Sequence, residues 1–352
     1  MVRMFGKHAH GPIGIEFTGR AVQMIQFTAD QSRVIDSVRW DLPPIPSGTT
    51  DDSPNHALHE AIQQACQGRK FRGRQVVACL TAKELFVQNV RVAKGPATEL
   101  EDLVRQEAAS RLPFPADEAD VRFVLAGEVR QGDQLRREII LMACHRPVVD
   151  QLLQMIDALG FRAVGIDVEP AAILRAYSRQ FRRDDDLQRR VMFVRMGTFN
   201  TVVVIARGTD VFFAKYINIG GHQMDSAVAE HLNISHDEAT TLRWTNGDRR
   251  ADQQDPEIAA SIAEATRGVI ERLISELSMC VRYHSVTFRG QKIDRVVVGG
   301  PDANQELANT LATRLEINCD LGDPLRSFEA PLPARRSRWD VTAGLALHDG
   351  GR

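Results

Sequence analysis

The sequence predicts an α/β protein built from two lobes that share one plan. The first observation is a run of three short strands rich in Val, Ile and Phe, expected at Val191–Met196, Thr201–Ala206 and Asp210–Ile217. The second is a similar run near the start of the chain, expected at Ile13–Phe17, Ala21–Phe27 and Arg33–Leu42. Helical segments follow both runs. We interpret the two runs as a structural duplication with little sequence identity; the alternative is a chance similarity of two meanders.

The composition is that of an ordinary globular protein, with 352 residues, 43% hydrophobic and 26% charged. The net charge of −2 gives no global field that favours nucleic acid or an anionic membrane. Five scattered cysteines without a CxxC pair predict neither a disulfide framework nor a zinc site, and they favour a reducing, cytoplasmic location. No apolar run approaches the roughly 18 residues of a membrane span. The N-terminus lacks the apolar core of a signal peptide.

The first lobe is expected to comprise residues 11–91 and 160–185. After the first meander, the pattern predicts a polar linker at Ser47–Pro54, followed by a helix. Further strands are expected at Gln75–Leu80, Leu85–Val92 and Phe161–Asp167. A helix is expected at Ala171–Phe181, where Glu169 and Pro170 suit a first helical turn. The charge run from Arg182 to Arg190 is interpreted as a solvated connector between the lobes.

An insertion of residues 92–159 is predicted within the first lobe. It begins with a helix at Thr98–Leu112, where Thr98 and Glu101 have the spacing of a capping box. Pro113 and Pro115 end that helix. Two strands and a second helix are expected to follow, at Asp120–Ala126, Arg137–Ala143 and Pro147–Leu159.

The second lobe is expected to comprise residues 186–340, with a helical subdomain at about 221–290. Its predicted helices and last long strand lie at Gly221–Leu232, His236–Trp244, Pro256–His284, Lys292–Val298 and Asp302–Arg314. Residues Pro331–Arg338 form a basic loop. A small-residue helix at 341–349 is expected to return to the first lobe.

Six segments spread over nearly the whole chain carry a family resemblance. They are GIEFTGRAVQMIQF, EAASRLPFP, GFRAVGIDVEPAAILRAY, KYINIGGHQM, IDRVVVGGPDAN and VTAGLAL. In this order and combination they resemble the PilM family of type IV pilus assembly proteins, which are actin-like proteins related to the cell-division protein FtsA. The combination of LPFP with INIGG points to PilM, since the EPAAILRAY and VVVGG elements look like ones shared with the DnaK-type chaperones. The resemblance implies the two-lobed fold of actin, the DnaK-type chaperones and the sugar kinases.

The resemblance also implies an ATP site between the lobes. The two phosphate motifs of such proteins correspond to Glu16-Phe17-Thr18 and to Arg195-Met196-Gly197. The glutamate that orders water around Mg²⁺ corresponds to Glu169, and the adenosine motif to Gly299-Gly300. On this basis the expected cofactor-binding residues are Glu16, Thr18, Gly19, Glu169, Arg195, Gly197, Thr198, Gly299 and Gly300.

The departures from the family motifs make ATP and Mg²⁺ doubtful ligands. Glu16 lengthens the expected side chain, and Thr18 places a Cβ where the family has Gly, although Gly19 compensates one position later. Arg195 places a cation where the family places a metal-facing carboxylate, and at about 4 Å this repels a divalent ion by several kcal/mol. Arginine can instead grip phosphate directly. Three outcomes stay open: a weak ATPase, nucleotide binding without turnover, and an empty cleft in which Arg195 pairs with Glu16 or Glu169.

Three functions are weighed on this evidence. The resemblance implies a cytoplasmic scaffold of a type IV pilus or related secretion machine, which reaches the inner membrane only through a partner. That partner would be a PilN-like bitopic protein whose cytoplasmic N-terminal tail binds between the insertion and the first lobe. The first alternative is an enzyme of the kinase or phosphatase branch, but the missing Asp and Gly residues and the absence of a GxSxG motif speak against it.

The second alternative is a filament-forming protein like FtsA, which leaves self-association open. That family ends in an amphipathic membrane helix after a linker, whereas this chain stops at Arg352, five residues after the VTAGLAL segment. Direct tethering to a membrane is therefore not expected. The sequence favours a pseudo-ATPase without catalytic residues or a metal site.

Overall fold

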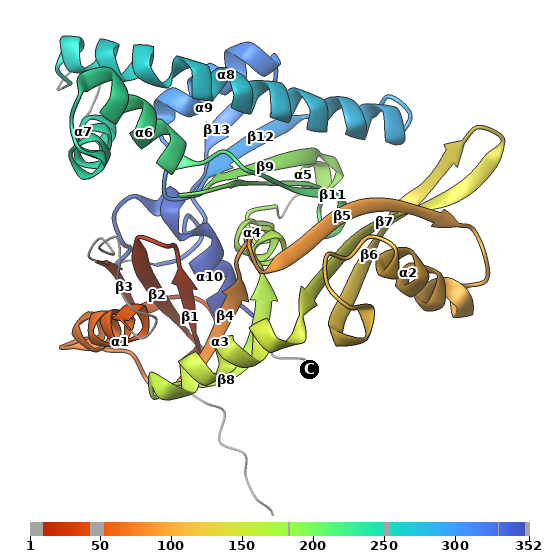
Figure 1. Cartoon of the computed structure of the whole chain (residues 1–352), viewed down its shortest axis with the longest axis horizontal. Helices are drawn as coiled ribbons and strands as arrows, with labels where there is room; N and C mark the ends of the chain where they lie inside the picture. Colours follow the sequence, from red (N-terminus) through yellow and green to blue (C-terminus); the bar gives the residue numbers. More distant parts are fainter. Residues whose placement is uncertain (1–9, 43–52, 182–183, 249–253, 330, 349–352) are drawn as a thin grey trace, which may run out of the picture.

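The computed structural model describes residues 10–42, 53–181, 184–248, 254–329 and 331–348. It contains two lobes, each built on a five-stranded sheet, and a smaller three-stranded sheet that projects to one side (Figure 1). The expected two-lobed α/β fold with an insertion is therefore confirmed. The predicted linker Ser47–Pro54, the connector Arg182–Arg190 and the last residue of the predicted helix 341–349 fall wholly or partly outside the described residues.

The sheets of the two lobes have the same topology. The first has the order β3-β2-β1-β4-β8 and comprises β1 (His10–Phe17), β2 (Ala21–Thr28), β3 (Val34–Asp41), β4 (Gln75–Leu80) and β8 (Arg162–Val168). The second has the order β11-β10-β9-β12-β13 and comprises β9 (Arg190–Met196), β10 (Thr201–Arg207), β11 (Asp210–Ile217), β12 (Arg295–Gly299) and β13 (Cys319–Leu321). In both sheets, the first strand of the meander lies at the centre. The next strand after the meander, β4 or β12, pairs with it in parallel. The predicted duplication is thus present in strand order and direction.

Among the described residues, two helices lie between the two five-stranded sheets, and most of the others cover the outer faces of the lobes (Figure 1). The inner pair is α4 (Glu169–Ser178) and α10 (Asp340–Ala346), which share one apolar cluster with strands of both lobes. On the first lobe, α1 (Ser53–Cys66) and α3 (Arg146–Ala158) pack on the opposite face. On the second lobe this place is taken by α6 (Gly221–Leu232), α8 (Pro256–Thr287) and α9 (Gln305–Leu315), with α7 (His236–Asp248) beside α6 and the short α5 (Asp184–Gln188) before β9.

Glycines let α10 approach its neighbours closely. A Cβ on Gly344 would lie 1.9 Å from the carbonyl oxygen of Ala172 in α4, and a Cβ on Gly14 in β1 would lie 2.2 Å from that of Thr342. Any side chain at either position would collide with backbone, which cannot rotate away. This contact holds the first turn of α10 beside β1, at the place where the nucleotide site is predicted.

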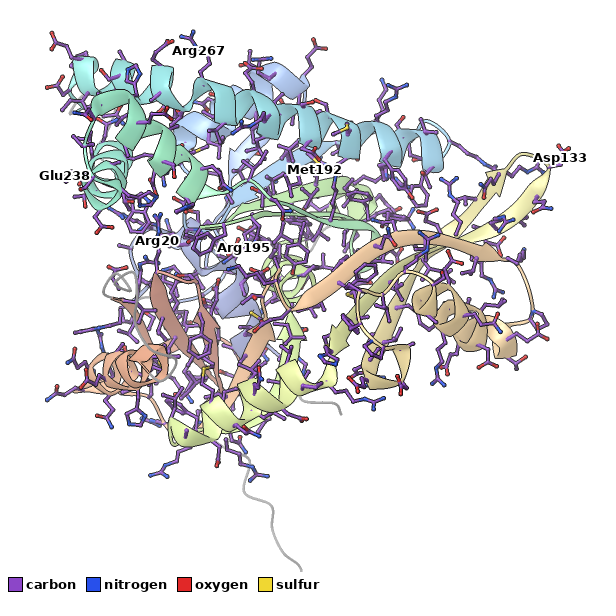
Figure 2. All side chains as sticks on the ribbon, in the orientation of Figure 1. Arg20, Asp133, Met192, Arg195, Glu238 and Arg267 are labelled. Carbon is purple, nitrogen blue, oxygen red and sulfur yellow. The ribbon has the colours of Figure 1, made fainter. Side chains whose placement is uncertain are left out.

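The insertion has different bounds from those expected. Its sheet has the order β5-β7-β6 and comprises β5 (Leu85–Ala93), β6 (Ala119–Gln131) and β7 (Gln134–His145), and the β6–β7 hairpin projects with Asp133 at its tip (Figure 2). The strand assigned to the first lobe, Leu85–Val92, pairs with β7 instead. Helix α3, assigned to the insertion, buries Leu152 and Ile156 in the core of the first lobe. The apolar pattern identifies these elements but does not reveal which sheet they join.

The capping box predicted for the insertion is wrong. Helix α2 (Leu100–Ala109) follows a 3₁₀ turn at Ala97–Glu99, and its N-cap is Glu99, which makes no side-chain cap. Because Thr98 lies inside the 3₁₀ turn, its hydroxyl is not at the N-cap. Helix α9 likewise begins later than predicted: Asn304 caps it by accepting a 2.8 Å hydrogen bond from Leu307 N.

The insertion also contacts the second lobe. The Asn89 side chain in β5 donates a 2.8 Å hydrogen bond to the Ala214 carbonyl in β11. Glu138 of β7 is fully buried, pairs with Arg91 at 2.9 Å and accepts a hydrogen bond from the Tyr283 hydroxyl in α8. Since removing one member of a buried polar network is costly, these bonds fix the insertion against the second lobe.

Candidate functional site

The two hairpin links predicted to hold phosphate lie against each other between the lobes. Gly19 in the β1–β2 link has a φ of +77°, and a Cβ there would lie 2.7 Å from the ring of Phe199 in the β9–β10 link. The hydroxyl of Thr18 is hydrogen-bonded to the backbone of Ala21 and so braces its own turn. A cavity of about 260 Å³ remains, and seven of the nine predicted residues line it: Glu16, Thr18, Gly19, Glu169, Arg195, Gly197 and Thr198.

Arg195 is the centre of a buried ion cluster beside this cavity. Its side chain, 4% exposed, extends from the end of β9 and lies between the lobes (Figure 2). Nη1 lies 2.9 Å from Glu169 Oε1 and Nε lies 3.3 Å from Asp340 Oδ1, while Nη2 pairs with Glu16. The carboxylates come from α4, α10 and β1. The ion pair that the sequence left open is therefore present, with both predicted partners and a third.

The predicted adenosine motif, Gly299-Gly300, packs directly against this ion cluster. A Cβ on Gly299 would lie 2.7 Å from Asp340 Oδ2, and a Cβ on Gly300 would lie 2.9 Å from Arg195 Cγ. These two glycines therefore leave room for the ion cluster and are not among the residues that line the cavity. Asp340 was missed by sequence reasoning, although its place at the start of a helix of small residues signals a close approach to other elements.

Burial changes the protonation of the cluster. It raises the pKa of Glu169 to about 7, against the opposing effect of Arg195 and with a further rise from Glu16. It raises the pKa of Asp340 to about 6, again against the effect of Arg195. One guanidinium cannot balance the charge of three buried carboxylates. Near neutral pH, the carboxyl groups of the cluster are therefore partly protonated, while Arg195 keeps its positive charge.

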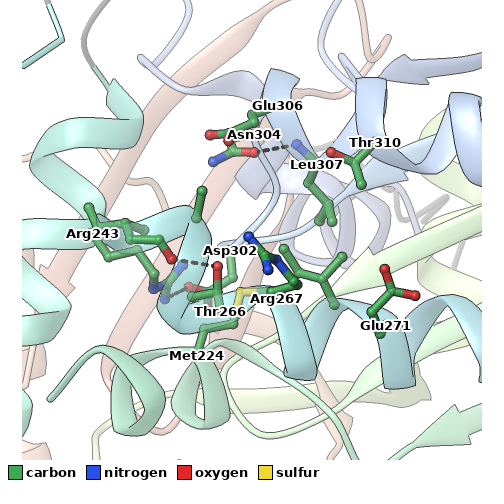
Figure 3. A pocket seen from close by; sticks show the side chains of 13 residues that line it. Met224, Arg243, Thr266, Arg267, Glu271, Asp302, Asn304, Glu306, Leu307 and Thr310 are labelled. Atoms are coloured by element: carbon green, nitrogen blue, oxygen red, sulfur yellow. Dashed lines mark hydrogen bonds and ion pairs between the residues drawn. The ribbon is translucent and has the colours of Figure 1, made fainter. Parts of the chain in front are cut away.

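A second ion cluster, separate from that of Arg195, also joins the two lobes. Arg243 in α7 lies 2.6 Å from Asp225 in α6. It also pairs with Asp302 after β12, as Figure 3 shows. Arg20, in the first lobe, lies 2.6 Å from the other oxygen of Asp225 and so bridges the lobes. The indole of Trp244 donates a 3.0 Å hydrogen bond to Asp302. Sequence reasoning missed this cluster because its members are widely separated in the chain.

The side chains at the predicted site do not fit hydrated Mg²⁺ with a nucleotide. Mg²⁺ requires oxygen ligands in a near-octahedral shell, but Glu16 and Glu169 bond to Arg195 instead. Backbone N–H groups of the two links cannot surround a phosphate while Phe199 lies on Gly19. Among the described residues, no group of three or more His, Cys, Asp or Glu side chains is arranged to hold a metal ion.

A separate groove lies at the insertion, near the start of α3. It has a volume of about 330 Å³ and includes Leu112, Ala116, Val121 and Arg146 among its lining residues. Leu112 also packs on the core of the insertion, and the ring of Phe114 contacts that of His145 in a tilted arrangement with the centroids 5.4 Å apart. Both residues thus support the insertion, and of the two only Leu112 lines the groove.

The comparisons with known proteins agree with this fold. A model of the family described as type IV pilus assembly protein PilM matches residues 14–348. The solved PilM-PilN type IV pilus biogenesis complex is similar with a TM-score of 0.75 and 21% identity, over 96% of this chain and 98% of that chain. The ethanolamine utilization protein EutJ from Carboxydothermus hydrogenoformans is similar with a TM-score of 0.55 and 11% identity, over 96% and 89%.

The solved structures, at these identities, establish a common fold, and the expected actin-like architecture is correct. Within the described residues, no helix is both long enough and apolar enough to cross a membrane. The family match spans nearly all of the sequence, from Gly14 to His348. The chain belongs to the family of the type IV pilus assembly protein PilM.

Proposed function

We propose that this chain is a scaffold of a type IV pilus machine and that it binds the cytoplasmic tail of a PilN-like membrane protein. The observation that carries the proposal is the family match over residues 14–348. The likeness to the PilM-PilN complex over 98% of that chain supports it. A scaffold of this kind needs a peptide site and a stable relative position of its lobes.

The groove at the insertion is the proposed peptide site. Its apolar lining, with Leu112 and Val121, suits alternate side chains of an extended segment, and charged residues at its edge, such as Arg122 and Arg146, can pair with others. Arg146 donates a 3.3 Å hydrogen bond to the Ala119 carbonyl, which ties the start of α3 to β6. The groove therefore lies where the first lobe and the insertion join, and this position supports the proposal.

The cleft between the lobes serves as a structural lock in this proposal. Arg195 joins the second lobe to Glu16 and Glu169 of the first, and Arg20 joins the first lobe to Asp225 of the second. Neither ATP nor Mg²⁺ is needed to hold the lobes together in this state. We therefore infer that the protein works as a pseudo-ATPase whose cleft its own side chains keep closed.

Filling the groove should prevent tail binding. Ala116 is exposed and lines the groove, so Ala116→Trp should weaken the binding of a synthetic PilN-like N-terminal tail at least about tenfold, or 1.4 kcal/mol. Fluorescence anisotropy of the labelled peptide measures this. Ala260→Trp, on the exposed face of α8, is the matched control and should bind as the wild type does. Equal affinities for all three proteins would place the peptide elsewhere, and no binding to the wild type would refute the proposed partner.

A further inference from the structure

The connection between α1 and β4 carries a cluster of cations. Its sequence from Gly68 is GRKFRGR, and Arg69, Lys70, Arg72 and Arg74 are all exposed. Arg162, at the start of β8, is exposed too, and its backbone N–H donates a 2.7 Å hydrogen bond to the Arg74 carbonyl. We call these five residues the basic surface. It lies on the first lobe, at the edge that Figure 1 shows lowest in the view.

The backbone of this connection is held in place by buried groups. Gln26 in β2 is fully buried, and its amide accepts a 2.8 Å hydrogen bond from Arg72 N and donates one of 2.8 Å to Arg72 O. Lys70 N donates to Asp36 in β3. Gly68 and Gly73 have φ values of +72° and +73°, which only glycine adopts freely. The cationic side chains are therefore presented from a fixed backbone.

Few acidic groups balance these cations. Arg69 lies 3.8 Å from Asp36, and this is the one ion pair that the structure records for the basic surface within the described residues. Asp157, near the end of α3, and Asp167, which pairs with Arg175, are equally close in sequence to Arg162. The whole chain has a net charge of −2, so this edge carries a local field opposite to that of the molecule.

We propose that the basic surface rests on the anionic lipid headgroups of the membrane. Clusters of four to eight Lys and Arg residues are typical of such contacts, and each cation near the bilayer strengthens binding about fivefold. The cluster lacks an exposed aromatic ring on which a nucleobase could stack, because Phe71 is half-buried and packs on the first-lobe core. The inference rests on the proposed function in one respect: a bound PilN-like tail brings the first lobe close to the membrane.

The consequence is a second, weak contact that orients the scaffold. A tail bound in the groove of the insertion fixes one point of the protein, and the basic surface supplies another on the same lobe. Because the tail holds the protein near the bilayer, even a weak lipid contact is occupied at the high effective concentration that results. The first lobe would then face the membrane and the second would face away from it.

Vesicle co-sedimentation of the full chain tests the proposal. At low salt, the wild type should bind vesicles of phosphatidylglycerol and phosphatidylethanolamine and should not bind vesicles of phosphatidylcholine. The triple variant Lys70→Gln, Arg72→Gln, Arg74→Gln should bind the anionic vesicles about a hundredfold more weakly, at about fivefold for each cation. Salt at about 1 M shortens the Debye length to about 3 Å and should abolish binding.

A matched variant separates this surface from a general charge effect. Arg272, Arg282 and Arg289 are exposed on the second lobe, so changing these three to Gln alters the net charge equally and should leave vesicle binding intact. Equal losses in both triple variants, no binding by the wild type, or a preference for duplex DNA over anionic vesicles would overturn the proposal. The Lys70, Arg72, Arg74 variant should still bind the tail peptide. Vesicle binding without peptide binding in the wild type would refute the proposed partner while supporting this surface.

Discussion

Replacing Arg195 with Met should lower the free energy of unfolding by about 3–5 kcal/mol, the usual cost of removing one partner from a buried ion pair. Met preserves the apolar stem of the side chain but removes the positive charge that Glu16, Glu169 and Asp340 share. These carboxylates would stay buried without a cation, and each would need a proton or water in its place. Urea unfolding at pH 8, followed by tryptophan fluorescence, measures the loss.

Two further variants show whether the contribution of Arg195 to stability depends on its burial or on the geometry of its guanidinium group. Arg267→Met removes an exposed arginine that pairs with Glu264 and should cost less than about 1 kcal/mol. Arg195→Lys should be intermediate, since an ammonium group lacks the fork with which Arg195 bonds three carboxylates. A loss below about 1 kcal/mol for Arg195→Met would show that the cluster does not hold the lobes together.

The stability of the protein should fall as the pH rises from about 4 to about 7. The folded-state pKa values of Glu169, about 7, and Asp340, about 6, lie above the ordinary values of 4.5 and 3.8. The folded state thus binds more protons than the unfolded state between these limits. The stabilisation that these groups supply is complete below their ordinary pKa values and is lost as the pH rises through 6 and 7, at up to about 1.4 kcal/mol per pH unit for each proton.

Thermal unfolding at a series of pH values measures this dependence. Glu169→Gln replaces the carboxyl group by a neutral amide of similar shape and should flatten the slope between pH 5 and pH 7. Glu276→Gln, which removes a partly exposed partner of Lys215, is the matched control and should preserve the wild-type slope. If Glu169→Gln and the wild type lose stability in parallel, the proton is not held by this cluster.

The repeated strand pattern was predictable because it depends on local order in the sequence. Apolar residues in short runs, separated by links such as Thr18–Arg20 and Gly197–Asn200, indicate a meander wherever they occur. The position of Arg195 in a family motif was enough to suggest its pairing with Glu16 or Glu169. Asp340 and Arg243 were missed, because contacts over 145 and 59 residues of sequence depend on how α10 and α7 pack and not on any local pattern.

The bounds of the insertion could not be predicted for a related reason. Val90 and Val92 give β5 the alternating spacing of a half-buried strand, which suits the first sheet as well as the third. Pairing with β7 determines which sheet β5 joins, because residues Arg136 to Cys144 of β7 pair with β5 along its whole length.

A thermal-shift titration of the wild-type protein with ATP, in the presence and absence of Mg²⁺, tests the closed cleft. A ligand at a hundredfold excess over its Kd raises the free energy of unfolding by about 2.7 kcal/mol, which gives a clear rise in melting temperature. Because Arg195 holds both carboxylates that Mg²⁺ would need, we expect no shift under either condition. A Mg²⁺-dependent rise would contradict the proposal, since it would mean that the cleft opens, that Arg195 releases Glu16 and Glu169, and that the protein responds to nucleotide.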